Sequence, residues 1–128
     1  MQHWLLVRGR GDRPLQREHR DEVTAHSSSK RPSVQPDDVA VLYASVWQAV
    51  YGIAEIAGDP ERDSSRTRWA WRFPLVPRVV IDDLEYAPAV EEAGVFPSSL
   101  WRHSYIRLTP DQFERAEDLI MSAARRGV

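Results

Sequence analysis

The sequence contains no cysteine, which excludes a disulfide scaffold and any metal site built on thiolates and is compatible with a cytoplasmic location. No apolar run approaches the roughly 18 residues that cross a bilayer, so we expect no membrane partner. The first residues, MQHWLLVRGRGD, carry neither a basic leader nor a small-residue cleavage site, and no signal peptide is predicted. A net charge of −2 argues against general binding of polyanions.

The residue clusters that mark most enzymes are also missing. The four histidines are scattered singly, without the spacing of metal ligands on one element, so we expect no metal and no cofactor. The GRGD segment at 9–12 lacks the Lys-Ser/Thr of a phosphate loop, and the carboxylates of Asp82 and Asp83 point apart on a strand end. No serine lies in a nucleophile elbow. We therefore predict a protein that is not an enzyme and has no catalytic residues.

What is present fits one globular domain over residues 1–128, with 42% hydrophobic and 28% charged residues. Every basic residue except Lys30 is arginine. This bias reflects either codon usage in a GC-rich genome or the use of planar guanidinium groups for phosphates and stacked bases. The five tryptophans are more informative, because an indole is costly to expose and its N–H makes it awkward to bury completely.

Hydrophobic periodicity predicts an α+β fold, a small and mostly antiparallel β-barrel flanked by helices. The clearest helix has Thr109 as its N-cap and Pro110 as its first residue. We expect a hairpin from two strands at 38–45 and 50–57. The other expected elements are strands at 3–8, 69–81 and 101–108 and short helices at 14–25 and 88–96.

The segment LWRHSYIRLT at 100–109 supplies part of a candidate site. In an extended strand Trp101, His103 and Tyr105 share one face, which suits a stacked heterocycle with a polar edge. The alternative is a Trp–Tyr core pair with His103 bonded to a carbonyl oxygen. Further candidate ligand-binding residues are two tryptophans near loops, a serine at a strand end and an arginine for a phosphate: Trp47, Trp69, Ser45 and Arg102.

Five motifs occur in a fixed order along the chain: HWLLVR, PDDVAVLYAS, YGIAEIAGDP, WAWRFPLVPRVVI and SYIRLTPDQFERAEDLI. Together they resemble the EVE domain family, relatives of the YTH and PUA-like barrels, over nearly the whole length. The resemblance implies a PUA-like barrel that binds nucleic acid through a modified base held in an aromatic-lined pocket at the barrel mouth. It also implies a separate effector enzyme, a nuclease or a modification enzyme, as a partner.

One segment departs from the family pattern. Many EVE domains carry an Asn/Arg-rich segment before the second strand, whereas VTAHSSSKRP occupies that position here, at 23–32. Either the ligand differs from that of the family, or other side chains supply the polar contacts. Those side chains are His26, Ser28, Ser29 and Lys30.

The resulting hypothesis is a non-enzymatic reader of DNA or RNA that recognises a modified or flipped base. One rival is a protein-interaction module whose aromatic mouth binds a partner side chain, and the near-neutral charge favours it slightly. A second rival is a hydrolase of the related ASCH type. That reaction would require a catalytic lysine or paired acids near the mouth, and only Lys30 qualifies.

Overall fold

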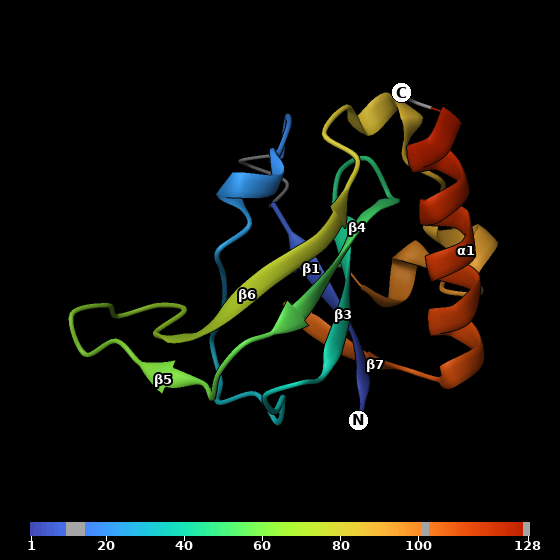
Figure 1. Cartoon of the computed structure of the whole chain (residues 1–128). Helices are drawn as coiled ribbons and strands as arrows, with labels where there is room; N and C mark the ends of the chain where they lie inside the picture. Colours follow the sequence, from blue (N-terminus) through green and yellow to red (C-terminus); the bar gives the residue numbers. More distant parts are fainter. Residues whose placement is uncertain (10–14, 101–102, 127–128) are drawn as a thin grey trace.

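The computed structural model describes residues 1–9, 15–100 and 103–126. A curled sheet carries one long helix, α1 (Pro110–Arg126), against one side (Figure 1). None of the helices in these ranges is both long and apolar enough to cross a bilayer. The other elements are the strands β1 (His3–Arg8), β2 (Ala25–Ser28), β3 (Val39–Ala44), β4 (Ala49–Ile56), β5 (Glu61–Arg62), β6 (Trp71–Val80) and β7 (Tyr105–Leu108), and the 3₁₀ turns η1 (Arg20–Glu22), η2 (Leu84–Tyr86), η3 (Val90–Ala93) and η4 (Pro97–Ser99).

The strand order in the sheet is β2-β6-β4-β3-β1-β7, and β5 pairs with the outer part of β6. The α+β class is confirmed, as are the expected hairpin of β3 and β4 and the strand at β1. The expectation of a mostly antiparallel barrel needs correction, because the sheet is mixed: β1 and β3 run parallel at its centre. Such a pairing requires a long crossover, and residues 9–38 provide it.

The helix expected at 14–25 is wrong. The described part of that range contains only η1 and the start of β2. Its weak apolar stripe cannot support a helix, and buried Glu18 and Val23 instead face inward from an irregular segment. The element expected at 88–96 is only the 3₁₀ turn η3, and β7 begins at Tyr105, later than expected.

The start of α1 follows the prediction from sequence. Thr109 Oγ1 accepts a hydrogen bond from the Gln112 N–H at 3.1 Å, and Gln112 Oε1 accepts one from the Thr109 N–H at 3.0 Å. This reciprocal capping box satisfies backbone donors that the first turn leaves open. The helix then buries Ala116, Ile120 and Ala123 against the sheet, so β3 is covered on both faces and all six of its residues are buried.

An irregularity in β4 changes the direction of one side chain. Opposite β4, Leu42 pairs with Gly52 and Tyr43 pairs with Val50, so Tyr51 is an extra residue in the ladder. A β-bulge of this kind redirects the residue that it inserts. Gly52 is required beside the bulge, since an added Cβ would lie 2.8 Å from the Val79 carbonyl oxygen.

Asp38 fastens the N-terminus to the start of β3. Its buried carboxylate accepts hydrogen bonds from the Gln2 N–H at 3.0 Å, the Trp4 indole at 2.9 Å and the Gln35 N–H at 3.0 Å. Burial acts to raise the pKa of Asp38, but these three donors outweigh burial and the pKa lies below its ordinary value.

We predict that Asp38→Asn lowers the free energy of unfolding by about 2 kcal/mol at neutral pH, because an amide NH₂ faces N–H donors. A carboxylate with a depressed pKa contributes stability above its unfolded pKa and loses it as pH falls through the folded value. The difference in free energy of unfolding between wild type and variant, measured by urea unfolding, should therefore become smaller below about pH 4. Asp37→Asn, at an exposed neighbour, is the control. An equal loss in the two variants would contradict the prediction.

Candidate functional site

The two end strands of the sheet order, β2 and β7, meet through side chains. No backbone ladder joins them in the described residues. Instead His26 Nε2 on β2 lies 2.8 Å from the carbonyl oxygen of Ser104, immediately before β7. Arg8, at the end of β1, donates from Nη1 to the Ala25 carbonyl oxygen at 2.7 Å. These two contacts close the curl of the sheet, and we call this junction the seam.

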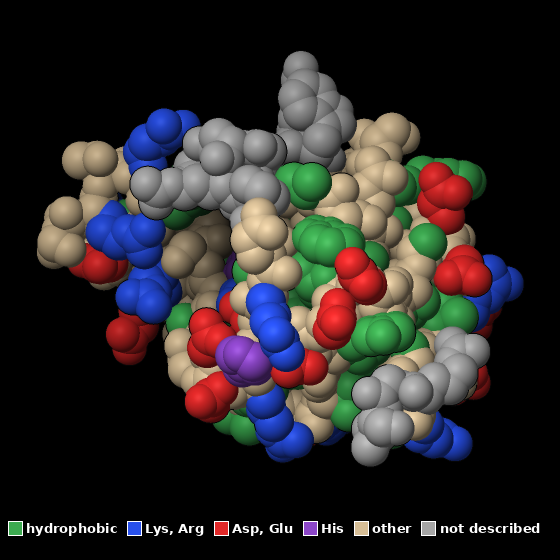
Figure 2. All heavy atoms as spheres, turned by 90° about the horizontal axis from the view of Figure 1, so that it is seen from above, with side chains coloured by type: hydrophobic (Ala, Val, Ile, Leu, Met, Phe, Trp, Pro, Cys, Tyr) green, Lys and Arg blue, Asp and Glu red, His purple; other side chains and the backbone are tan. Residues whose placement is uncertain are grey.

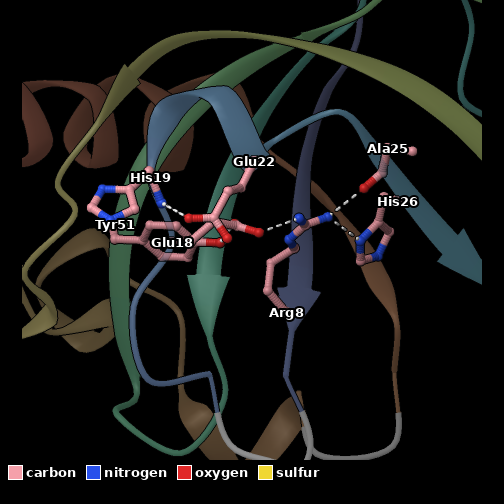
Figure 3. Close-up of polar contacts among 7 residues, drawn as sticks. All are labelled: Arg8, Glu18, His19, Glu22, Ala25, His26 and Tyr51. Atoms are coloured by element: carbon pink, nitrogen blue, oxygen red, sulfur yellow. Dashed lines mark hydrogen bonds and ion pairs between the residues drawn. The ribbon is translucent and has the colours of Figure 1, made fainter.

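A buried ion pair lies behind the seam (Figure 3). Arg8 Nη2 donates to Glu18 Oε2 at 2.7 Å, and the two side chains are only 11% and 10% exposed. Tyr51, redirected by the bulge, donates its hydroxyl proton to Glu18 Oε1. Burial, together with the Glu18 carboxylate, raises the pKa of Tyr51. Burial disfavours the charged form of Arg8, but Tyr51 and Glu18 outweigh it and raise the Arg8 pKa. Arg8 therefore keeps its charge, and Glu18 is its partner in the ion pair.

His26 is held neutral and in one tautomer. Its Nδ1 lies 3.2 Å from Arg8 Nη1, and a guanidinium has only donors, so Nδ1 accepts. Nε2 therefore carries the hydrogen and donates to Ser104. Burial, and after it the Arg8 charge, lower the pKa of His26 to about 3. The hydrogen bond to Ser104 acts in the opposite direction, because it favours the protonated form. Arg8 and Glu18 cancel, so this part of the site has no net charge.

A pocket of about 730 Å³ opens at the seam, with Arg8, Glu18 and His26 in its wall. That volume lies within the range of about 300–1,000 Å³ that is typical of small-molecule sites. Trp69 and Tyr43 add ring surface to the lining. No group of three or more His, Asp or Glu side chains in the described ranges is placed to hold a metal ion.

Ser45 places an unpartnered polar atom beside the pocket. Its Oγ is buried and has no hydrogen-bond partner within the part of the chain that the structure describes. Ser45 also lines the pocket. An orphaned buried hydroxyl costs about 1–3 kcal/mol, and a bound ligand with a polar edge would remove that cost.

Of the site residues expected from sequence, the fold gathers five around the pocket: His26, Ser29, Ser45, Trp69 and His103. Lys30 is exposed and does not line the pocket. Ser28 is buried and donates to the Lys30 carbonyl oxygen at 2.6 Å. Trp101 and Arg102 lie outside the described residues.

Two further candidates have contacts of their own. The indole of Trp47 is 41% exposed, and its N–H donates to the Leu15 carbonyl oxygen at 2.9 Å. Tyr105 packs edge-on against Trp4, with ring centroids 5.8 Å apart. Neither lines the pocket, so the expected Trp-His-Tyr face is divided in the described structure: His103 faces the pocket and Tyr105 packs against Trp4.

Sequence reasoning named His26 but missed the other two residues of the polar wall, Arg8 and Glu18. Glu18 belongs to a run, REHRDE, that is typical of a solvated surface, yet Glu18 is only 7% exposed. Its partners lie 10 and 33 positions away, at Arg8 and Tyr51, and no local pattern links them. The one available signal was Arg8 itself, a charge placed directly after the apolar residues WLLV.

Trp69 and Gln48 both line the pocket with left-handed backbone, at φ values of 48° and 53°. Such a conformation is uncommon for any residue other than glycine, and for a bulky side chain it is a genuine outlier. Strained residues of this kind persist where surrounding structure fixes them, and they concentrate at ligand sites.

Comparison with known proteins identifies the fold and no family. No family model matches the sequence, and no curated protein matches it. The solved structures that are similar over almost their whole length include three from different organisms. They are an NMR structure from Rhodopseudomonas palustris (TM-score 0.64, 13% identity, 98% of this chain and 94% of that chain), a hypothetical protein from Leishmania major (0.65, 10%, 95% and 96%) and a crystal structure from Agrobacterium tumefaciens (0.58, 12%, 99% and 93%). At these identities the likeness shows the small α+β fold alone.

We predict that burial of neutral His26 makes stability depend on pH. A histidine with a depressed pKa contributes its full stability above the unfolded pKa of 6.5 and loses it as pH falls toward the folded value. The resulting loss is about 2 kcal/mol at pH 5. In His26→Gln, whose amide can still donate to Ser104 and accept from Arg8, urea unfolding should show a shallower pH slope. Exposed His103→Gln should keep the wild-type slope, and an unchanged slope in His26→Gln would overturn the assignment.

We also predict an inverted order of stability at Trp69. Glycine ordinarily destabilises relative to alanine, but a left-handed position penalises every residue with a Cβ by about 1–2 kcal/mol. Trp69→Gly should therefore be about 1 kcal/mol more stable than Trp69→Ala in urea unfolding. Trp71, in the extended strand β6, is the matched control, where alanine should be the more stable replacement. If the alanine variant were more stable than the glycine variant at both positions, the left-handed conformation of Trp69 would be contradicted.

Proposed function

We propose that this protein is a non-enzymatic reader of nucleic acid that holds one modified or flipped base in the seam pocket. The observation that carries the proposal is the combination of Trp69, the unpartnered Ser45 hydroxyl and a wall whose charges are paired, all in one pocket. A base outside its stack regains about 1–3 kcal/mol by lying on an aromatic face. Its polar edge also needs donors and acceptors inside the pocket.

The charge of the wall favours a neutral heterocycle over a free anion. The Arg8 guanidinium is already paired with Glu18, and His26 is neutral. A phosphate or carboxylate against Arg8 and Glu18 would lose its hydration without gaining an unpaired cation from that pair, and Arg66, which also lines the pocket, is exposed. A base, with donors and acceptors but no charge, avoids that desolvation penalty.

We also propose that the chain belongs with the EVE domains and their PUA-like relatives. The support is the order of the five motifs, together with the curled sheet into which four of them fold as β1, β3, β4 and β6. The fifth, SYIRLTPDQFERAEDLI, forms β7 and the capped start of α1. A separate nuclease or modification enzyme is the proposed effector partner.

The test is fluorescence anisotropy of labelled oligonucleotides with the full chain. Matched DNA and RNA strands would carry one plain, methylated, hydroxymethylated or abasic position. We expect one base to bind more tightly than the abasic strand, and Trp69→Ala to weaken that binding by about 1–3 kcal/mol. Ser45→Ala should reduce the discrimination between bases, because the polar edge loses a partner.

Tyr86→Ala is the matched aromatic control, since Tyr86 is exposed in η2 and does not line the pocket. It should bind like wild type. Equal binding of every strand, including the abasic one, with no effect of Trp69→Ala would exclude the reader. That outcome would favour the rival in which the pocket accepts a side chain of a partner protein.

A further inference from the structure

The side of the pocket formed by the β5–β6 hairpin is strongly basic. Arg66 from this hairpin lines the pocket and donates to Ser27 Oγ at 3.5 Å. Arg72 pairs with Ser27 of β2 and with Glu61 of β5 in the sheet, so it belongs to the same surface as Arg66. We call residues 61–72, together with Lys30 and Arg31, the basic arm. Figure 2 shows Lys and Arg side chains grouped on the hairpin side of the molecule, at the left, next to a hollow.

Charge is separated between this arm and the opposite side of the fold. The arm carries six cations against two carboxylates, Glu61 and Asp63. The cations are Lys30, Arg31, Arg62, Arg66, Arg68 and Arg72. Residues 82–94 contain five carboxylates and no Lys or Arg, and they lie on the α1 side of the sheet, away from the hairpin (Figure 1). The net charge of −2 therefore averages two oppositely charged regions.

Two arginines of the arm are stacked on tryptophans. The Arg68 guanidinium carbon lies 5.2 Å from the centre of the Trp69 ring, and that of Arg31 lies 5.6 Å from the Trp71 ring. A guanidinium stacked in this way is held in place while its in-plane N–H groups remain suited to a phosphate. Alternation of cations and aromatic rings is typical of surfaces that bind single strands.

We propose, building on the reader function above, that the basic arm binds the sugar–phosphate backbone of a single-stranded nucleic acid beside the base in the pocket. A single strand delivers an unpaired base without the unstacking energy that a duplex requires. The division of charge fits this geometry, with phosphates on the positive arm and the neutral base against the wall in which Arg8 and Glu18 cancel.

The experiment measures the salt dependence of binding with an abasic strand of about 12 residues, as DNA and as RNA, so that the arm is tested without the pocket. Each phosphate contact with a single strand contributes about 0.7 to the slope of log affinity against log salt. The variant Arg68→Gln/Arg72→Gln removes two exposed cations that do not line the pocket. The control Arg115→Gln/Arg125→Gln removes the same charge from exposed positions on α1.

We expect the arm variant to lower the slope by about 0.7 for each phosphate left without its arginine and the helix control to keep the wild-type slope. The tighter of the DNA and RNA strands then identifies the natural backbone. Equal slopes in the arm variant, the control and wild type would overturn the proposal, as would a duplex that binds more tightly than either strand. Base discrimination on the same proteins is a separate readout: its absence alone would count against the pocket and leave the arm standing.

Discussion

The buried charge of Arg8 is the constraint on which the rest of the structure depends. A guanidinium that is only 11% exposed must be paired, because an isolated buried ion is far more costly than a buried ion pair. Glu18 supplies the counter-charge, and this requirement draws the segment before β2 inward as an irregular strap in place of a surface helix. The Tyr51 hydroxyl donates to the second oxygen of the Glu18 carboxylate, and the bulge in β4 directs the Tyr51 side chain toward it. The same guanidinium fixes the tautomer of His26, whose other nitrogen ties β2 to the residue before β7.

Closure by side chains explains why a pocket lies at this point. In a continuous ladder the backbone groups of β2 and β7 would satisfy one another and leave no opening. At the seam, side chains donate these hydrogen bonds instead: the Ala25 carbonyl oxygen accepts one from Arg8, and the Ser104 carbonyl oxygen accepts one from His26. Side chains reach further than backbone groups, so the two end strands stand apart and the space between them becomes the pocket. The fold and the site are consequences of one arrangement of donors and acceptors.

Features encoded within a few residues were predictable from the sequence. The Thr109–Gln112 cap, the β3–β4 hairpin and the strand at β1 depend on local patterns and are present. Ser45 and Trp69 were predicted from their positions at a strand end and near a loop, and both reach the pocket. The parallel pairing of β1 with β3, the strap around Glu18 and the inward turn of Tyr51 depend on partners far away in the chain. Glu18 looks like a surface residue until the position of Arg8 is known.

The residues that line the pocket divide into those that hold the fold together and those that do not. Arg8, Glu18 and His26 both line the pocket and hold the sheet together, so a substitution there would change the lining of the pocket and the stability of the fold at once. Ser29, Ser45 and Trp69 line the same pocket and take no part in the Arg8–Glu18 ion pair or the His26–Ser104 contact. Their replacement changes the rings and polar atoms that a ligand meets while the ion pair and the seam persist. The rings and polar atoms that the proposed ligand meets can therefore change without loss of the ion pair, whereas the pairing of Arg8 with Glu18 both holds the fold together and cancels the charge of that wall.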